Sequence, residues 1–210
     1  MSSLATLDRW QRLCSDSGLS DPQQRTFKRL MRHWRGWGRH YHSLRHLHAC
    51  LHEFDAVHGL AQCPAEVELA LWFHDAIYRT YRTDNEQRSA AWARQFIQSQ
   101  DHPSISADRV SDLILATRHH ANPVSGDAAL VVDIDLSILG QPADLYAHFE
   151  RAVRREYWWV SRRRFNDARR QILLGFLERT ALYHFEAFNA RYAASAQRNL
   201  AWALRQMRIR

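Results

Sequence analysis

A histidine and an aspartate lie side by side in the apolar segment LWFHDAIY, residues 71–78. The spacing predicts one buried helical face that holds Val67, Leu71, His74 and Tyr78, with Asp75 about 100° further round the axis. A buried carboxylate beside an imidazole is unfavourable unless it is paired or bound to a cation. The pair therefore indicates either a metal site or a core histidine next to an aspartate that bonds neighbouring backbone.

A histidine cluster precedes this segment, in the stretch RHYHSLRHLH. His42 and His46 are four residues apart, so we expect them to stack on one face of a helix. This spacing suits one metal ligand and one proton donor. His40 and His48 are further choices, and a solvated histidine-rich surface is the structural alternative.

Two aspartates interrupt a later apolar segment, LVVDIDLSILG, residues 130–140. Asp133 falls on the helical stripe of Leu130 and Ile134, whereas Asp135 falls on another apolar face. Carboxylates in such a segment need compensation, which a metal ion would supply. Either aspartate could be the ligand.

The apolar spacing is helical along the whole chain, and no run of residues reads as a strand. Gly18 can end the first helix, and Asp21 before Pro22 is typical of the start of the next. Pro64 opens the helix of the His-Asp pair, and a short apolar helix ends at Gly140. The predicted fold is an all-α bundle.

The order along the chain is His, then His-Asp, then Asp, on separate helices. This order resembles the HD superfamily of metal-dependent phosphohydrolases, which is named for the dyad, over roughly residues 35–140. YHSLRH is similar to the Tyr-His-Asn-x-x-His stretch of cyclic nucleotide phosphodiesterases, and DIDLSILG to the Asp-Ala-Asp-x-Leu segment of smaller HD hydrolases. HDAIY, DNEQRSA, EYWWV and RNLAWAL look like a group of bacterial proteins described as predicted HD phosphohydrolases.

The resemblance implies a role for each residue that matches these motifs. His46, His74, Asp75 and Asp133 would be metal ligands, and His42 would be the proton donor. It also implies a single all-α domain over residues 1–210. An HD-like helical core would cover about 35–140, and additional C-terminal helices would cover about 141–210.

Four further residues are candidates for substrate contacts or proton transfer. Arg79 and Arg82 could hold a substrate phosphate, and Glu86 could be a base or supporting carboxylate near the metal. His120 could contact a phosphate or a second metal. The structural alternatives are solvated loop arginines, a carboxylate that complements a helix dipole, and a histidine at a helix end.

The chain is strongly basic, with a net charge of +7 and a pI of about 9.8. Residues 151–210 hold 14 Arg against 4 acidic residues. This field would attract a phosphorylated substrate or a nucleic acid, although no nucleic-acid motif is present and an Arg-rich surface is the simpler interpretation. We expect the aromatic run 157–159 in the core. The alternative is an aromatic-basic surface with the arginines at 162–164.

Cys14, Cys50 and Cys63 are an odd set without a CxxC pair, which predicts free thiols and a cytoplasmic location. The chain contains no apolar run of about 18 residues and no secretion signal, so we expect no membrane partner. A homodimer through the C-terminal helices is a further option.

The expected function is that of a metal-dependent phosphohydrolase, which uses a metal-activated water to cleave a phosphomonoester or phosphoanhydride. The resemblance implies that the substrate is a nucleotide. The mixed nitrogen and oxygen ligands suit one Mn²⁺, Fe²⁺, Co²⁺, Ni²⁺ or Zn²⁺, with Mg²⁺ as a further option. The alternatives are a non-catalytic metal- or nucleotide-binding regulatory protein, an Arg-rich nucleic-acid-binding protein, and a small di-iron oxygenase.

Overall fold

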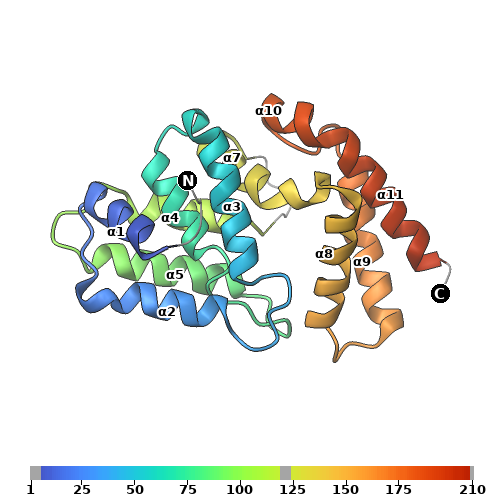
Figure 1. Cartoon of the computed structure of the whole chain (residues 1–210), viewed down its shortest axis with the longest axis horizontal. Helices are drawn as coiled ribbons and strands as arrows, with labels where there is room; N and C mark the ends of the chain where they lie inside the picture. The colour runs from blue at the N-terminus through green and yellow to red at the C-terminus, as the bar shows by residue number, and fades with distance from the viewer. Residues whose placement is uncertain (1–5, 119–123, 209–210) are drawn as a thin grey trace. The chain divides into compact units, whose positions relative to one another are not determined.

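The computed structural model describes residues 6–118 and 124–208, and its regular structure there is helical without any strand (Figure 1). This confirms the predicted all-α fold. The chain divides into two compact units, one up to Ile134 and the other from Asp135 onward. The single domain over 1–210, with a core over 35–140 and an extension over 141–210, stays a prediction.

Within its described residues, the first unit contains six helices of ten or more residues and the start of a seventh. In chain order its elements are α1 (Leu7–Asp16), the 3-10 turn η1 (Pro22–Gln24), α2 (Arg25–Trp34), α3 (Leu44–Val57), the 3-10 turn η2 (His58–Leu60), α4 (Pro64–Phe73), α5 (Asn85–Gln98), α6 (Ala107–Ala116) and most of α7 (Gly126–Leu136).

Helix α4 forms the centre of this unit, because it contacts α1, α3, α5 and α6. Pro64 occupies its first turn, as predicted. Trp72 and Phe73 are fully buried, and the Trp72 ring meets the Trp10 ring edge-on at 5.2 Å. A helix that is apolar all round is stable only when neighbours cover every face.

Ion pairs tie the surrounding helices to α4 and to one another. The Arg9 guanidinium on α1 donates to Asp55 on α3 at 2.7 and 2.9 Å and to Glu68 on α4 at 2.8 Å. Glu66, a buried carboxylate in the first turn of α4, accepts from Arg109 on α6 at 2.6 and 2.7 Å. Pairing of this kind is what makes a buried carboxylate tolerable.

Two glycines lie at the predicted helix ends. Gly18 follows α1 with a φ of +65°, and a Cβ there would lie 2.7 Å from the His102 carbonyl oxygen. Gly140 ends a 3-10 turn, where a Cβ would lie 2.5 Å from Cβ of Tyr192. Only glycine, which has no Cβ, therefore fits at these two positions.

Asp21 connects α1 with α2, although not as the simple helix start that we predicted. Residues 22–24 form the 3-10 turn η1, and α2 begins at Arg25. The Asp21 carboxylate reaches across this turn and accepts the backbone N–H groups of Thr26 at 2.8 Å and Phe27 at 2.9 Å. It also accepts the indole N–H of the buried Trp10 at 2.9 Å. One carboxylate therefore caps α2 and satisfies a buried donor.

The second unit continues from the end of α7. Its elements are the 3-10 turn η3 (Ser137–Gly140), α8 (Ala143–Glu156), α9 (Arg162–Leu177), the short α10 (Glu186–Phe188), the π-helical turn η4 (Asn189–Ala193) and α11 (Ala194–Arg208). The last three form one continuous helical stretch with a π-helical turn in it.

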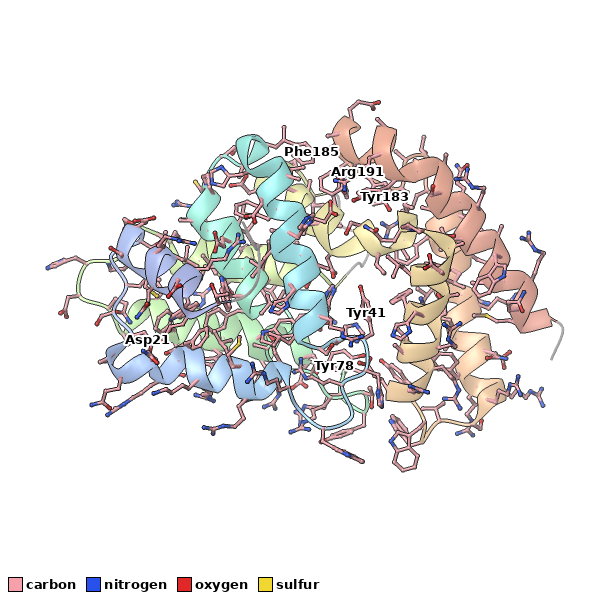
Figure 2. All side chains as sticks on the ribbon, in the orientation of Figure 1. Asp21, Tyr41, Tyr78, Tyr183, Phe185 and Arg191 are labelled. Carbon is pink, nitrogen blue, oxygen red and sulfur yellow. The ribbon has the colours of Figure 1, made fainter. Side chains whose placement is uncertain are left out.

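Polar side chains fix the start of this unit to its later helices. The Asn199 amide on α11 donates to the carbonyl oxygens of Leu139 at 2.9 Å and Gln141 at 2.8 Å. The buried Tyr183 hydroxyl, labelled in Figure 2, donates to the Leu136 carbonyl at 3.2 Å. These bonds satisfy carbonyls that the ends of α7 and η3 leave unpaired.

The expectation that residues 157–159 lie in the core is wrong for both tryptophans. Trp158 is 68% exposed and Trp159 is 50% exposed. The reason is that α8 ends at Glu156, so the helical spacing that would turn them inward stops there. The Arg154 side chain bonds two carbonyl oxygens of this turn and holds it in place.

The described cysteines are free thiols, as predicted, with Cys14 and Cys50 buried and Cys63 half-buried. Burial raises the pKa of the Cys14 thiol to about 12, and the nearby Asp21 carboxylate adds to the effect. None of the described helices is long and apolar enough to cross a membrane.

We predict that Asp21→Ala lowers the free energy of unfolding by about 2 kcal/mol, because it removes a cap and leaves the Trp10 indole N–H buried without an acceptor. Urea unfolding measures the change. The matched control is Asp16→Ala, at an exposed position at the end of α1, which should change stability by less than about 0.5 kcal/mol. Equal effects of the two substitutions would contradict the capping role.

Candidate metal centre

The His-Asp pair lies at the end of α4. The helix ends at Phe73, with His74 as its C-cap residue, so the single helical face that we predicted through Tyr78 stops at His74. The backbone then turns, and the Ala76 N–H donates to the Phe73 carbonyl at 2.8 Å. His74 is 1% exposed, and Asp75 is half-buried. The pair therefore occupies a buried helix end.

Of the four histidines between residues 39 and 48, His46 contacts both residues of this pair. It is in the first turn of α3 and is 4% exposed. His42 precedes the helix, so the two do not share a helical face as expected, yet their ring centroids are 6.0 Å apart. His48 is half-buried, and burial lowers its pKa, whereas His40 is exposed.

The two buried imidazoles and the Asp75 carboxylate converge. Nε2 of His46 and Nε2 of His74 are 3.1 Å apart, and Asp75 Oδ2 lies 3.7 and 3.4 Å from them. Nδ1 of His74 is 2.9 Å from the Leu71 carbonyl oxygen. A carbonyl only accepts, so Nδ1 carries the proton and the Nε2 lone pair faces His46. Two ring nitrogens this close require a shared proton or a shared cation.

A thiol and a carboxylate of α7 form a second set of donors with the same two histidines, and this set does not include Asp75. Cys50 lies one turn after His46 on α3, and its Sγ is 3.7 Å from the His46 ring nitrogens. One donor atom each from His46, Cys50, His74 and Asp135 lies within 4.8 Å of the other three. This nitrogen, sulfur and oxygen set can hold a divalent transition metal.

Helix α7 carries both aspartates that the sequence offered as ligands. Asp133 is fully buried, and Asp135, two residues later on the same helix, is half-buried and belongs to the candidate group. Asp133 as a ligand stays a prediction. Cys50 was predicted only as a free thiol. Its spacing of four from His46 is the signal that could have placed it in the group.

Arg39 holds the turn after α4, and the sequence did not single it out. Its guanidinium donates to the carbonyl oxygens of Asp75 at 2.8 Å, Ala76 at 3.0 Å and His42 at 2.9 Å. Nδ1 of His33 lies 3.0 Å from the Ala76 oxygen, and burial lowers the pKa of this histidine. Arg39 thus joins the backbone of Asp75 to that of His42.

Two side chains of the motif DNEQRSA, residues 84–90, bond the backbone of the segment that follows the His-Asp turn. The Asn85 side chain on α5 accepts the Arg79 backbone N–H at 2.9 Å and donates to the Arg79 carbonyl at 3.0 Å. The Ser89 hydroxyl accepts the Ile77 N–H at 3.0 Å. The exit of the chain from the His-Asp turn is therefore fixed by α5.

Aromatic rings surround the converging donors. The Trp34 ring lies 5.5 Å from the His74 ring, and the Tyr41 ring lies 4.7 Å from the His46 ring. The Tyr78 ring stacks on His42 at 4.0 Å; Tyr41 and Tyr78 are labelled near the start of α3 in Figure 2. Such apolar surroundings strengthen the electrostatic interactions of buried polar groups.

The remaining predicted residues do not contact this group through any hydrogen bond or ion pair among the described residues. Arg79 is exposed, and Glu86 is half-buried in the first turn of α5. The Arg82 guanidinium donates to Asp84 at 2.7 and 3.0 Å and lowers the pKa of that carboxyl. His120 lies outside the described residues.

Comparison of the chain with protein-family models, with curated proteins and with solved structures finds no match.

We predict that Arg39→Ala weakens Zn²⁺ binding by about ten-fold, because the His-Asp turn loses two hydrogen bonds, to Asp75 and Ala76, and its link to the His42 carbonyl. Competition with a chromophoric chelator measures the affinity. Arg32→Ala, at an exposed position on α2, removes the same charge away from the turn and should leave the affinity unchanged. Unaltered Zn²⁺ affinity in Arg39→Ala would contradict the positioning role.

Proposed function

We propose that the chain is a metal-dependent phosphohydrolase of the HD type, which cleaves a phosphomonoester or phosphoanhydride of a nucleotide. The observation that carries the proposal is the convergence of His46, His74 and Asp75, whose ring nitrogens and carboxylate oxygen lie 3.1 to 3.7 Å apart. Donor atoms this close around one point, in a buried aromatic setting, are balanced by a shared proton or by a bound cation, and the proposal takes the cation.

The ligands would be these three residues and an aspartate of α7. A bound metal lowers the pKa of a coordinated water and offsets charge on phosphoryl oxygens. Mn²⁺, Fe²⁺, Co²⁺, Ni²⁺ and Zn²⁺ all accept such ligands, and Mg²⁺ prefers oxygen alone. Participation of Cys50 would favour Zn²⁺ or Fe²⁺ within this series.

His42 is the proposed general acid. Its ring is held by stacking on Tyr78 and lies beside His46, from where it would protonate the leaving oxygen. We assign Glu86 as the carboxylate that would accept a proton from the attacking water. Arg79, Arg82 and His120 would contact the substrate phosphate.

The substrate class follows from charge and from the resemblance to HD proteins. A net charge of +7 favours an anionic substrate by long-range attraction. A phosphate ester or anhydride carries that charge, and hydrolysis of its P–O bond is the chemistry that the ligand set suits. The nucleotide part of the proposal rests on the resemblance.

A second candidate function is a regulatory protein that binds metal or nucleotide without turnover. It is favoured by Glu86, whose carboxylate makes no contact with the ligand group among the described residues, and by Arg82, which is engaged by Asp84. A catalytic site would require both side chains to reorient toward the substrate. Turnover therefore distinguishes the two candidates.

The test of the metal site is the metal content of the purified protein and of two matched variants. We expect about one transition metal per chain in the wild type and in His48→Ala, and none in His46→Ala, because His46 points its Nε2 at His74 and belongs to the candidate group, whereas His48 does not belong to it. Inductively coupled plasma mass spectrometry gives the stoichiometry. Equal metal content in both variants, or no metal in the wild type after addition of Mn²⁺ or Zn²⁺, would overturn the proposal.

Activity is then measured on a panel of phosphate esters and nucleotides with added Mn²⁺ or Zn²⁺. Hydrolysis that is lost in Asp75→Ala supports the enzyme, and full metal occupancy without turnover of any substrate supports the regulatory protein. Asp133→Asn and Asp135→Asn, compared side by side, decide which carboxylate of α7 is the ligand.

We predict that Cys50→Ser weakens Zn²⁺ binding by about ten-fold and leaves Mn²⁺ binding nearly unchanged, because a thiolate ligand favours the softer ion. Competition titrations with the two metals measure the affinities. Cys63→Ser, at a half-buried thiol outside the group, is the control. A parallel loss for both metals would mean that Cys50 supports the fold rather than the metal.

A further inference from the structure

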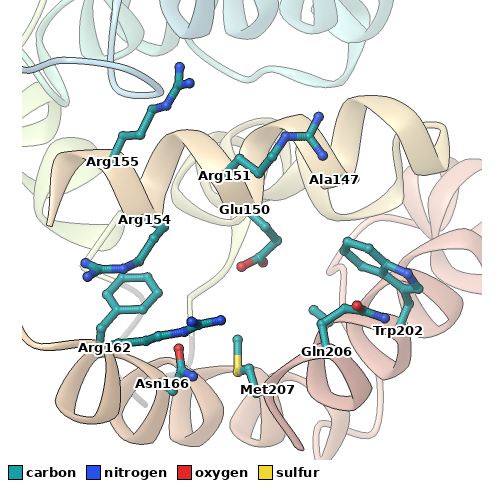
Figure 3. A pocket seen from close by; sticks show the side chains of 12 residues that line it. Ala147, Glu150, Arg151, Arg154, Arg155, Arg162, Asn166, Trp202, Gln206 and Met207 are labelled. Atoms are coloured by element: carbon teal, nitrogen blue, oxygen red, sulfur yellow. The ribbon is translucent and has the colours of Figure 1, made fainter. Parts of the chain in front are cut away.

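The second unit contains a pocket of about 580 Å³ between helices α8, α9 and α11 (Figure 3). All the residues that line it belong to this unit, and none belongs to the candidate metal centre. The volume is in the range of pockets that hold one small organic ligand.

One end of the pocket carries a fixed positive charge. The Arg154 guanidinium donates to the carbonyl oxygens of Tyr157 and Val160, the latter at 2.9 Å, and lies 4.8 Å from the centre of the Phe165 ring. Carbonyl oxygens orient a guanidinium without neutralising it. Arg154 is therefore held in place with its charge available to an anion.

A second guanidinium of the pocket lining has no fixed partner. Arg162 is exposed in the first turn of α9 and makes no hydrogen bond or ion pair within the described part of the chain. Figure 3 shows it extending into the middle of the pocket, whereas the Arg154 guanidinium points the opposite way and Arg151 and Arg155 extend to the other side of α8. Arg162 can therefore bind one phosphate directly, and Arg154 adds positive charge to the lining.

The acidic residue in the lining is already paired. The Glu150 carboxylate accepts from the Arg169 guanidinium at 2.7 and 3.2 Å and from the Tyr146 hydroxyl at 2.8 Å. It lies between the arginine end and Trp202 in Figure 3. Its lone pairs can still accept a ligand hydroxyl, but its charge would repel a second anionic group placed beside it.

The other end of the pocket is aromatic and offers unused amides. The half-buried Trp202 ring meets Tyr146 edge-on at 6.3 Å, and Met207 lies nearby in the lining. The side-chain amides of Asn166 and Gln206 make no hydrogen bond with a described residue. An indole face with free amide groups suits a heteroaromatic base, which stacks and is recognised at its edge.

We propose that this pocket binds a nucleoside monophosphate. The phosphate would contact Arg162, with Arg154 adding positive charge, a ribose hydroxyl would face Glu150, and the base would lie at Trp202. A single phosphate fits because the cationic end is followed at once by a carboxylate. A nucleic acid strand would need further cationic groups along its path, and Glu150 interrupts such a path.

The test is isothermal titration of the full chain in EDTA, which prevents nucleotide binding through a metal ion. The probes are the four ribonucleoside 5′-monophosphates, their triphosphates, the nucleosides and inorganic phosphate. We expect at least one monophosphate to bind about ten-fold or more tightly than its nucleoside, its triphosphate and phosphate alone. Absence of binding by every monophosphate would overturn the proposal.

Two charge-reversal variants locate the bound phosphate. Arg162→Glu should raise the Kd of the monophosphate by about ten-fold or more, whereas Arg163→Glu, an exposed neighbour outside the pocket lining, should change it less than about two-fold. Equal losses in the two variants would show attraction to the general basic surface and overturn the pocket.

Two further measurements separate this pocket from the other sites. Monophosphate binding that persists in Asp75→Ala supports a site distinct from the metal centre, and its loss there would assign the nucleotide to that centre. Binding of single-stranded RNA that is steeply salt-dependent and unaffected by Arg162→Glu, without monophosphate binding, would instead favour a nucleic-acid surface.

Discussion

The candidate metal centre depends on one constraint, which is that helix α4 ends in a buried environment. The last carbonyl groups of a helix have no partner within it, and a buried helix end must find partners elsewhere. Here Nδ1 of His74 satisfies the Leu71 carbonyl, and Arg39 donates to the carbonyls of Asp75 and Ala76. The same bonds orient the imidazole and the carboxylate toward His46.

Arginine has a comparable role in both units, where its guanidinium organises a turn through backbone carbonyls. Arg39 holds the turn after α4, and Arg154 holds the turn between α8 and α9. A guanidinium presents several donors in a fixed plane, so it can bond more than one carbonyl and still carry its full charge. The basic composition of the chain thus contributes to local structure and to the attraction of anions.

The chemistry of the two candidate sites differs because their donors differ. The candidate metal centre gathers lone pairs from His46, His74, Cys50 and Asp135, which could hold a cation. The pocket of the second unit is lined by N–H donors of Arg154 and Arg162, which favour an anion. A divalent metal and a phosphate are complementary in charge to these two environments respectively.

The sequence by itself determined the helical fold and several helix ends, and it singled out His74, which belongs to the candidate metal group. These features depend on local spacing and on the backbone preferences of glycine and proline, which a sequence displays directly. Only the tertiary structure decided that α4 stops at Phe73, that Trp158 and Trp159 are exposed, and that Cys50 joins the ligand group. The reason is that donor atoms from separate helices meet only through packing and through turns held by residues distant in the chain.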